Sequence, residues 1–281
     1  MQKSKIAVIG GSGVYKLDGI QVVKEHKIST PYGQPTSEII EATIGEDTFY
    51  FLPRHGKGHT FTPSEVNYRA NIFALKSLGV EYIISVSAVG SLKEEYPPTT
   101  FVLVDQFIDW TKGMRERTFF NNGFVAHVSA AEPVEKQLQQ MLVQACKDVG
   151  VKHGDGGSYI CIEGPQFSSK AESHIYRSFG ASVIGMTNVP ESYLAKEAGI
   201  AYATVAMVTD YDCWKEEHCT LEEIMKVMKT NNQNAQKVLM NVLPKLSKNP
   251  FSFKKENTHA VLTQPEHLSA EQKHILEVLI K

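Results

Sequence analysis

The sequence predicts an α/β fold: a single domain in which helices flank a mixed central β-sheet. Nearly continuous apolar runs, such as "AYATVAMV", are typical of central strands that are covered on both faces. Segments with the hydrophobic spacing of helices are interspersed among these runs, and neither an internal repeat nor a low-complexity linker divides the chain. We therefore expect one domain over residues 1–281.

The strand predictions rest on composition and alternation. The early runs alternate apolar and polar residues, which favours antiparallel pairing, and several others are apolar almost throughout. In chain order, the predicted strands are "KIAVIG", "IQVVKEHKI", "SEIIEATI", "TFYFLP", "EYIISVSAV", "FVLVDQFI", "GSYICIEG", "ASVIGM" and "AYATVAMV".

The helix predictions rest on start and stop signals. A capping box at Thr62–Glu65, with Pro63 at the first helical position, predicts a helix that ends before Gly79. A helical stripe of core residues indicates another helix in "EPVEKQLQQMLVQACKDVG". Similar boxes begin at Ser169, Thr220 and Ser269. Residues 246–267 are loop-like and are interpreted as a tether for the last helix.

Composition excludes several functions. Hydrophobic residues make up 42% of the 281 positions, and a formal net charge of -2 argues against nucleic acid or an anionic membrane as a partner. No apolar stretch has the length of a membrane-spanning helix, and the N-terminal run is better interpreted as a first strand than as a signal peptide. Four cysteines without a CxxC pattern fit a reducing, cytoplasmic compartment.

A metal site is not expected. His55 and His59 in "HGKGH" are separated by glycines that disfavour the helix needed to align an i,i+4 pair, and no third ligand is nearby. The dinucleotide-binding fingerprint also fails, because Lys16 stands where a glycine is needed after Gly11 and Gly13. We therefore expect no metal and no nucleotide cofactor.

Three motifs at strand ends could hold a small anion. Ser12 lies in the glycine-rich "IGGSG", Arg54 and His55 follow a strand in "LPRHG", and Ser87 and Ala88 lie in "SAVGSL". Glycine-rich backbone, a forked guanidinium, an imidazole donor and hydroxyls all suit phosphate oxygens. Taken singly, the glycine-rich motif is explained about as well by a tight turn. Arg54 and His55 are better explained by a surface arginine beside a packed histidine, and "SAVGSL" is a poor signal on its own.

Two further motifs suggest a planar ligand. "EGPQFSS" presents Phe167 and Ser168 at the mouth of a helix, where an aromatic ring could stack on a heterocycle. "GMTNVPE" places Met186 and Thr187 just past an apolar strand, where they would offer an apolar floor and a hydroxyl. Ordinary turn packing is the alternative for the first motif.

The most informative stretch is "TDYD", in which Thr209, Asp210 and Asp212 follow a buried strand. One aspartate here could cap a following helix, but two close carboxylates raise each other's pKa and suggest a group that holds a proton near neutral pH. The motifs together predict a site with two ends. One end is an anion-binding group of hydroxyls, backbone amides, Arg54 and His55, here called the basket, and the other is a carboxylate pair suited to a heterocycle with N–H donors.

These motifs occur in a recognisable order. "MTNVPESYLAKEAGIAYATVAMVTDYDCWK", "IGGSG", "RHGKGH", "SEVNYRANIFALK", "SAVGSL", "DQFID", "AEP" and "IEGPQFSS" resemble the family of trimeric purine nucleoside and 5'-methylthioadenosine phosphorylases. The resemblance covers roughly Lys5 to Leu246, and the segment from about residue 247 is divergent. It implies the phosphorylase fold and a homotrimer without nucleic-acid or membrane partners.

The resemblance also implies a reaction, in which methylthioadenosine and inorganic phosphate, a co-substrate, give adenine and 5-methylthioribose 1-phosphate without any cofactor. The implied phosphate ligands are Ser12, Arg54, His55, Ser87, Ala88 and Thr187. Met186 would lie under the ribose, and Phe167 and Ser168 would contact base and sugar. Asp210, with Thr209 beside it, would protonate N7 as a general acid, and Asp212 would accept from the exocyclic amine.

The 5' end of the substrate is implied to lie between subunits. Leu221 and Met225 would line an apolar alkylthio pocket, and His127 would reach the same pocket of a neighbouring subunit. Gln166 departs from the family, where arginine is usual. Three alternatives remain: a 6-oxopurine or methylthioinosine phosphorylase, a catalytically silent nucleoside-binding protein, and an NAD-binding module. Asp210 argues against the 6-oxopurine or methylthioinosine enzyme. The complete set of implied phosphate ligands argues against the silent binding protein, and the failed dinucleotide fingerprint argues against the NAD-binding module.

Overall fold

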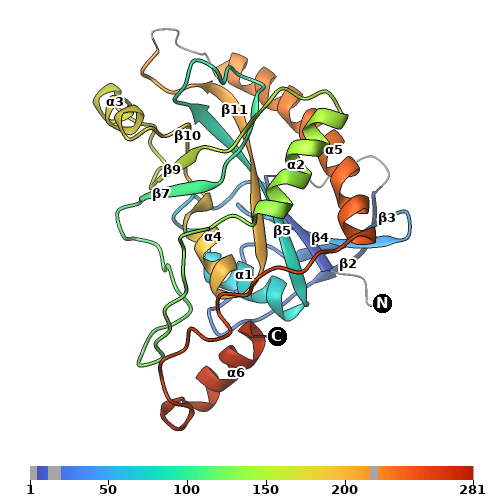
Figure 1. Ribbon diagram of the computed structural model, residues 1–281, viewed down its shortest axis with the longest axis vertical. Helices are drawn as coiled ribbons and strands as arrows, with labels where there is room; N and C mark the ends of the chain where they lie inside the picture. Colours follow the sequence, from blue (N-terminus) through green and yellow to red (C-terminus); the bar gives the residue numbers. More distant parts are fainter. Residues whose placement is uncertain (1–4, 12–19, 216–220, 281) are drawn as a thin grey trace.

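Within residues 5–11, 20–215 and 221–280, which the computed structural model describes, eleven strands form one mixed sheet. Figure 1 shows this sheet running through the middle of the molecule, with helices on both sides. The mixed α/β fold predicted from the sequence is therefore confirmed.

The strands occupy most of the predicted apolar runs. They are β1 (Lys5–Gly10), β2 (Ile20–His26), β3 (Ile39–Ile44), β4 (Asp47–Pro53), β5 (Val80–Ser91), β6 (Phe101–Leu103), β7 (Gln106–Trp110), β8 (His153–Asp155), β9 (Ser158–Ile162), β10 (Val183–Gly185) and β11 (Ala201–Tyr211). The helices are α1 (Tyr68–Ser77), α2 (Lys136–Asp148), α3 (Lys170–Ser178), α4 (Asn188–Glu197), α5 (Leu221–Lys248) and α6 (Ala270–Leu279), with a 3₁₀ turn at Pro265–His267.

The longest strand, β5, organises the sheet. The order is β2-β3-β4-β1-β5-β10-β9-β7, and β11 pairs with both β5 and β6. β1 pairs in parallel with β4 and β5, and β5 pairs in parallel with β11. The carboxyl ends of these four strands therefore meet at one edge of the sheet, which is where open α/β sheets bind ligands. The early strands β2, β3 and β4 are antiparallel, as predicted.

Helices cover the sheet in two groups. α2 and α5 pack together on one face, and α1 and α4 pack together on the other, as Figure 1 shows. The C-terminal segment belongs to the same core, because α6 packs on α1 and Leu279 is fully buried. The Asn257 side-chain amide holds this segment in place, because its Nδ2 donates to the carbonyls of Glu197 and Leu279. No helix among the described residues is both long and apolar enough to cross a membrane.

Two helix starts match the sequence and one does not. Complete capping boxes open α3 at Ser169 and α6 at Ser269, as predicted. The predicted start at Pro63 is wrong, because α1 begins at Tyr68 with Asn67 as its N-cap. The Glu65 carboxylate instead accepts from the Thr62 N–H and hydroxyl, which closes a local turn before the helix. The box predicted at Thr220 lies outside the described residues.

The run "FVLVDQFI" is two strands rather than one. The chain leaves β6 after Leu103, and the N–H groups of Asp105 and Gln106 donate to the Gly157 carbonyl. β6 pairs with β11 and β8, whereas β7 pairs with β9. Helix α4 had not been predicted. It begins directly after Thr187 and so fixes the position of that residue at the edge of the sheet.

Candidate active site

A cavity of about 1090 Å³ opens where the carboxyl ends of the parallel strands meet. Residues from the ends of β4, β5, β10 and β11 and from the first turns of α5 line it. The predicted site residues in its wall are Arg54, His55, Ser87, Ala88, Phe167, Ser168, Met186, Thr187, Thr209, Asp210, Asp212 and Met225. Predicted site residues as far apart in the chain as Arg54 and Met225 thus converge, as the sequence motifs indicated.

Three predicted residues need separate mention. Ser12 lies outside the described residues, although Gly11 beside it lines the cavity. Leu221 begins α5, but its side chain also lies outside the description. His127 is exposed away from this wall, and its N–H donates to the Ala260 carbonyl. The structure of one chain therefore does not bring His127 to its own cavity.

Arg54 is buried and largely committed to protein partners. Its Nε and Nη2 donate to the two carboxylate oxygens of Glu191, at 2.6 and 2.8 Å. Nη2 also donates to Ser85 Oγ at 2.6 Å, and Nη1 donates to the Val86 carbonyl at 3.1 Å. These four bonds, set against the five N–H donors of a guanidinium, leave one Nη1 hydrogen for a ligand. Arg54 is thus a rigid single donor whose charge is mostly cancelled by Glu191.

His55 has a defined tautomer. Its Nδ1 lies 2.9 Å from the Phe61 carbonyl, which can only accept, so Nδ1 carries the proton. Burial, followed by the charge of Arg54, lowers the pKa of the imidazole to about 4. The neutral ring therefore leaves Nε2 as an acceptor. We had expected His55 to be a second donor; the structure instead suits it to a protonated phosphate oxygen.

The hydroxyls of Ser87 and Thr187 lie side by side. Ser87, near the end of β5, and Thr187, the N-cap residue of α4, place their oxygens 3.1 Å apart. Both residues are buried, and the Thr187 hydroxyl makes no capping bond to its helix. Two hydroxyls at this distance can donate to neighbouring oxygens of one tetrahedral anion.

Asp210 is held near the end of β11. Its Oδ1 lies 2.6 Å from the Thr209 hydroxyl, which is also 3.1 Å from the Val89 carbonyl. Burial, with a smaller contribution from the charge of Asp212, raises the pKa of the Asp210 carboxyl. Thr209 occupies Oδ1, so Oδ2 is the oxygen left for a ligand. A carboxyl in this setting retains its proton more readily than one in water.

Asp212 has an unpaired oxygen in the cavity wall. The side chain is only 7% exposed, and its Oδ2 has no hydrogen-bond partner among the described residues. Buried carboxylate oxygens normally have partners, so this one calls for a ligand with a donor. Asp210 lies within β11, which ends at Tyr211, so it does not directly precede a helix.

The remaining wall is apolar and partly open. Met186 lies against Gly164, where a Cβ would come within 2.4 Å of its Sδ. Phe167 is 83% exposed and Met225 is 62% exposed, although both line the cavity. Ser168 Oγ has no partner among the described residues. The part of the chain that the structure describes thus leaves two large apolar side chains exposed at the rim of the cavity.

Several site residues were missed in the sequence. Ile224 and Met228 line the cavity beside Met225, and their helical spacing from Leu221 was a usable signal. Glu191 and Ser85, which orient Arg54, carried no signal, because their contact with Arg54 spans distant parts of the chain.

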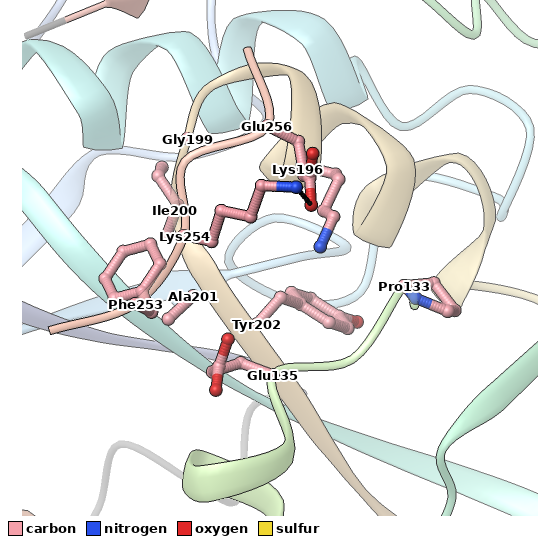
Figure 2. A pocket seen from close by; sticks show the side chains of 10 residues that line it. All are labelled: Pro133, Glu135, Lys196, Gly199, Ile200, Ala201, Tyr202, Phe253, Lys254 and Glu256. Carbon is pink, nitrogen blue, oxygen red and sulfur yellow. Dashed lines mark ion pairs between the residues drawn. The ribbon is translucent and has the colours of Figure 1, made fainter. Parts of the chain in front are cut away.

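A second hollow is too small for a substrate. It lies at the start of β11, between the end of α4 and the C-terminal segment, and has a volume of about 10 Å³. Figure 2 shows its lining side chains, including the ion pair between Lys254 and Glu256. This volume is about that of one water position. The described residues contain no cluster of three His, Cys, Asp or Glu side chains that could hold a metal ion.

The fold and the site define a class. The model of the phosphorylase superfamily matches residues 5–244, which include the cavity residues from Gly11 to Gln236. The chain is 51% identical to an S-methyl-5'-thioadenosine phosphorylase of Hyperthermus butylicus over 249 residues, covering 88% of this chain and 90% of the relative. The chain belongs to the family of S-methyl-5'-thioadenosine phosphorylases within this superfamily.

Solved structures agree with this assignment. A methylthioadenosine phosphorylase from an antarctic soil metagenomic library superposes with a TM-score of 0.92 at 45% identity, covering all of both chains. A variant of the adenosine/methylthioadenosine phosphorylase of Schistosoma mansoni, solved in complex with methylthioadenosine, superposes with a TM-score of 0.83 at 35% identity. That match covers 88% of this chain and 93% of the other.

The Arg54–Glu191 pair predicts how the basket responds to mutation. Arg54→Ala removes a donor that the sequence predicts for phosphate. It also leaves Glu191 buried without its charged partner, which should cost about 3–5 kcal/mol of stability. The double variant Arg54→Met, Glu191→Leu removes both charges and should recover most of that stability without recovering phosphate use. Thermal unfolding and phosphate KM measured on both variants check this. A double variant with the phosphate KM of the wild type would remove Arg54 from the site.

Proposed function

We propose that this protein catalyses phosphorolysis of 5'-methylthioadenosine to adenine and 5-methylthioribose 1-phosphate, with inorganic phosphate as co-substrate and no cofactor. The observation that carries the proposal is the pair at the end of β11: burial raises the pKa of Asp210, and Asp212 Oδ2 has no donor among the described residues. Adenine offers an acceptor at N7 and a donor at its 6-amino group, so it satisfies both carboxyl groups.

The carboxyl pair supplies the acid. Cleavage of the N-glycosidic bond leaves negative charge on the purine, and protonated Asp210 can donate from Oδ2 to N7 as that charge develops. Thr209 holds Oδ1 and so acts through Asp210. Asp212 accepts from the amine through Oδ2, which has no partner among the described residues. Because the two carboxyls interact, their protons belong to the pair and the observed titration is that of both groups.

The basket would hold phosphate, which is the nucleophile. Cleavage leaves positive charge on the sugar, and phosphate held beside it stabilises that charge and then captures C1'. The remaining Arg54 N–H and the hydroxyls of Ser87 and Thr187 would donate to phosphate, while His55 Nε2 would accept its P–OH proton. Ser12 and Ala88 complete the proposed basket. Met186 would support the ribose, with Phe167 and Ser168 at the base and sugar.

A substrate panel tests the function directly. Release of free base from methylthioadenosine, adenosine, methylthioinosine and inosine is measured with and without phosphate. We expect phosphate-dependent release with methylthioadenosine preferred over adenosine, because Ile224, Met225 and Met228 offer no partner to a 5'-hydroxyl. Binding without phosphate-dependent turnover would identify a silent binding protein, and a preference for inosine would identify a 6-oxopurine enzyme.

Asp210→Asn tests the acid. The amide still donates a hydrogen bond but delivers no proton, so most activity on methylthioadenosine should be lost, with relative preference shifting toward methylthioinosine by about one to two decades, or roughly 1–3 kcal/mol. In the wild type, kcat/KM should fall as pH rises through the raised pKa of Asp210, since the acid form is lost. The variant should lack this alkaline limb. A substrate ratio unchanged by the mutation would show that Asp210 does not discriminate between bases.

We also propose that the active form is a homotrimer with sites between subunits. The open rim at Phe167 and Met225 supports this, since another surface is needed to cover it. A matching apolar projection exists on the chain: Val125 and Leu262 are exposed, flank His127, and are joined where the Leu262 N–H donates to the Val125 carbonyl. The free cysteines Cys146, Cys161 and Cys213 support a cytoplasmic location.

The trimer is tested by light scattering combined with activity. We expect three chains per particle, or six if trimers pair. Leu262→Glu should lower kcat/KM for methylthioadenosine while Asp210 and the basket of the same chain remain intact. A fully active monomer would contradict this arrangement.

A further inference from the structure

A tyrosine stands directly behind the phosphate basket. Tyr159, on β9, is fully buried, and its ring passes next to the backbone of Gly185 on the paired strand β10. A Cβ added at Gly185 would lie 1.9 Å from the phenol oxygen and 2.5 Å from Cζ. The absence of a side chain at position 185 is therefore what lets the phenol reach this place.

The phenol hydroxyl contacts the residues of the basket rather than the cavity. Its oxygen lies 3.3 Å from Ser87 Oγ and 3.5 Å from the Thr187 nitrogen. Ser87 Oγ in turn lies 3.1 Å from Thr187 Oγ1. Three hydroxyls and one N–H thus form a connected chain at the back of the basket.

The direction of this chain follows from its members. The Thr187 N–H can only donate, so the phenol oxygen accepts there and turns its own hydrogen toward Ser87 Oγ. Burial raises the pKa of Tyr159 to about 12, so the phenol keeps that hydrogen at working pH. A hydroxyl that accepts from one side is polarised to donate on the other. With the phenol donating to it, Ser87 Oγ keeps its own hydrogen for donation. The acceptors within reach are the Ala88 carbonyl at 3.4 Å, Thr187 Oγ1 at 3.1 Å and an anion in the cavity that Ser87 lines.

We propose that Tyr159 is a positioning residue for phosphate: its hydroxyl donates to Ser87 Oγ and orients the Ser87 hydroxyl as a donor toward the anion. This inference rests on the proposed function, since it requires that Ser87 binds phosphate. Tyr159 itself touches neither substrate, and its effect should appear in the use of phosphate and not in the use of the nucleoside.

Tyr159→Phe removes the hydroxyl and leaves the ring. Phosphate KM, measured with saturating methylthioadenosine, should rise roughly two- to tenfold, the range expected for one hydrogen bond. Methylthioadenosine KM should stay unchanged. Tyr82→Phe is the matched control, because Tyr82 is a buried tyrosine whose hydroxyl donates to the Phe251 carbonyl near the opposite end of β5. It should lower thermal stability without changing phosphate KM.

A double-mutant cycle with Ser87→Ala separates the possible failures. We expect Ser87→Ala to raise phosphate KM, and Tyr159→Phe to add little further in its presence. If Ser87→Ala leaves phosphate KM unchanged, the assignment of Ser87 to phosphate fails and this inference falls with it. If Ser87→Ala raises phosphate KM but Tyr159→Phe does not, the inference alone is overturned. Fully additive effects would show that Tyr159 does not act through Ser87.

Discussion

The buried ion pair between Arg54 and Glu191 is the interaction on which the site depends. It ties the end of β4 to α4, and Ser85 on β5 and Tyr202 on β11 donate to the same carboxylate. This one planar contact therefore fixes the positions of four elements relative to one another. A buried ion pair contributes little net stability compared with apolar packing, but losing one partner is costly. Its value here is geometric, because it fixes one free N–H at the edge of the sheet.

The same pair sets the electrostatic character of the cavity. Glu191 offsets the Arg54 charge, His55 is neutral, and burial raises the pKa of Asp210. The cavity wall around Arg54 therefore carries less charge than the residue types there suggest. In the proposed mechanism, oriented dipoles would supply most of the hold on phosphate, which would leave its negative charge available to the developing sugar cation. Strong cationic trapping would stabilise bound phosphate before the reaction as much as during it.

Local signals predicted much of this molecule, and contacts between distant residues account for what was missed. Apolar runs, the capping boxes at Ser169 and Ser269, and the motifs at strand ends are properties of short segments, so they could be recognised in the sequence. The role of Glu191 could not, because its partner lies 137 positions away and a carboxylate within a helix ordinarily faces solvent. Tyr159 lies in an apolar strand, where it resembles any core aromatic residue. The true start of α1 was missed because Thr62 and Glu65 form a turn whose sequence is the same as that of a helix cap.

The close fit of Tyr159 under Gly185 also constrains how this sequence can change over time. No residue with a side chain can enter position 185 while the ring is in place, so replacement of Tyr159 by something smaller has to come first. That first step would leave Ser87 without its phenol neighbour. A polar side chain arriving later at position 185 could then occupy the vacated space and supply a new donor. Divergence at these two positions is therefore ordered and passes through a weakened intermediate.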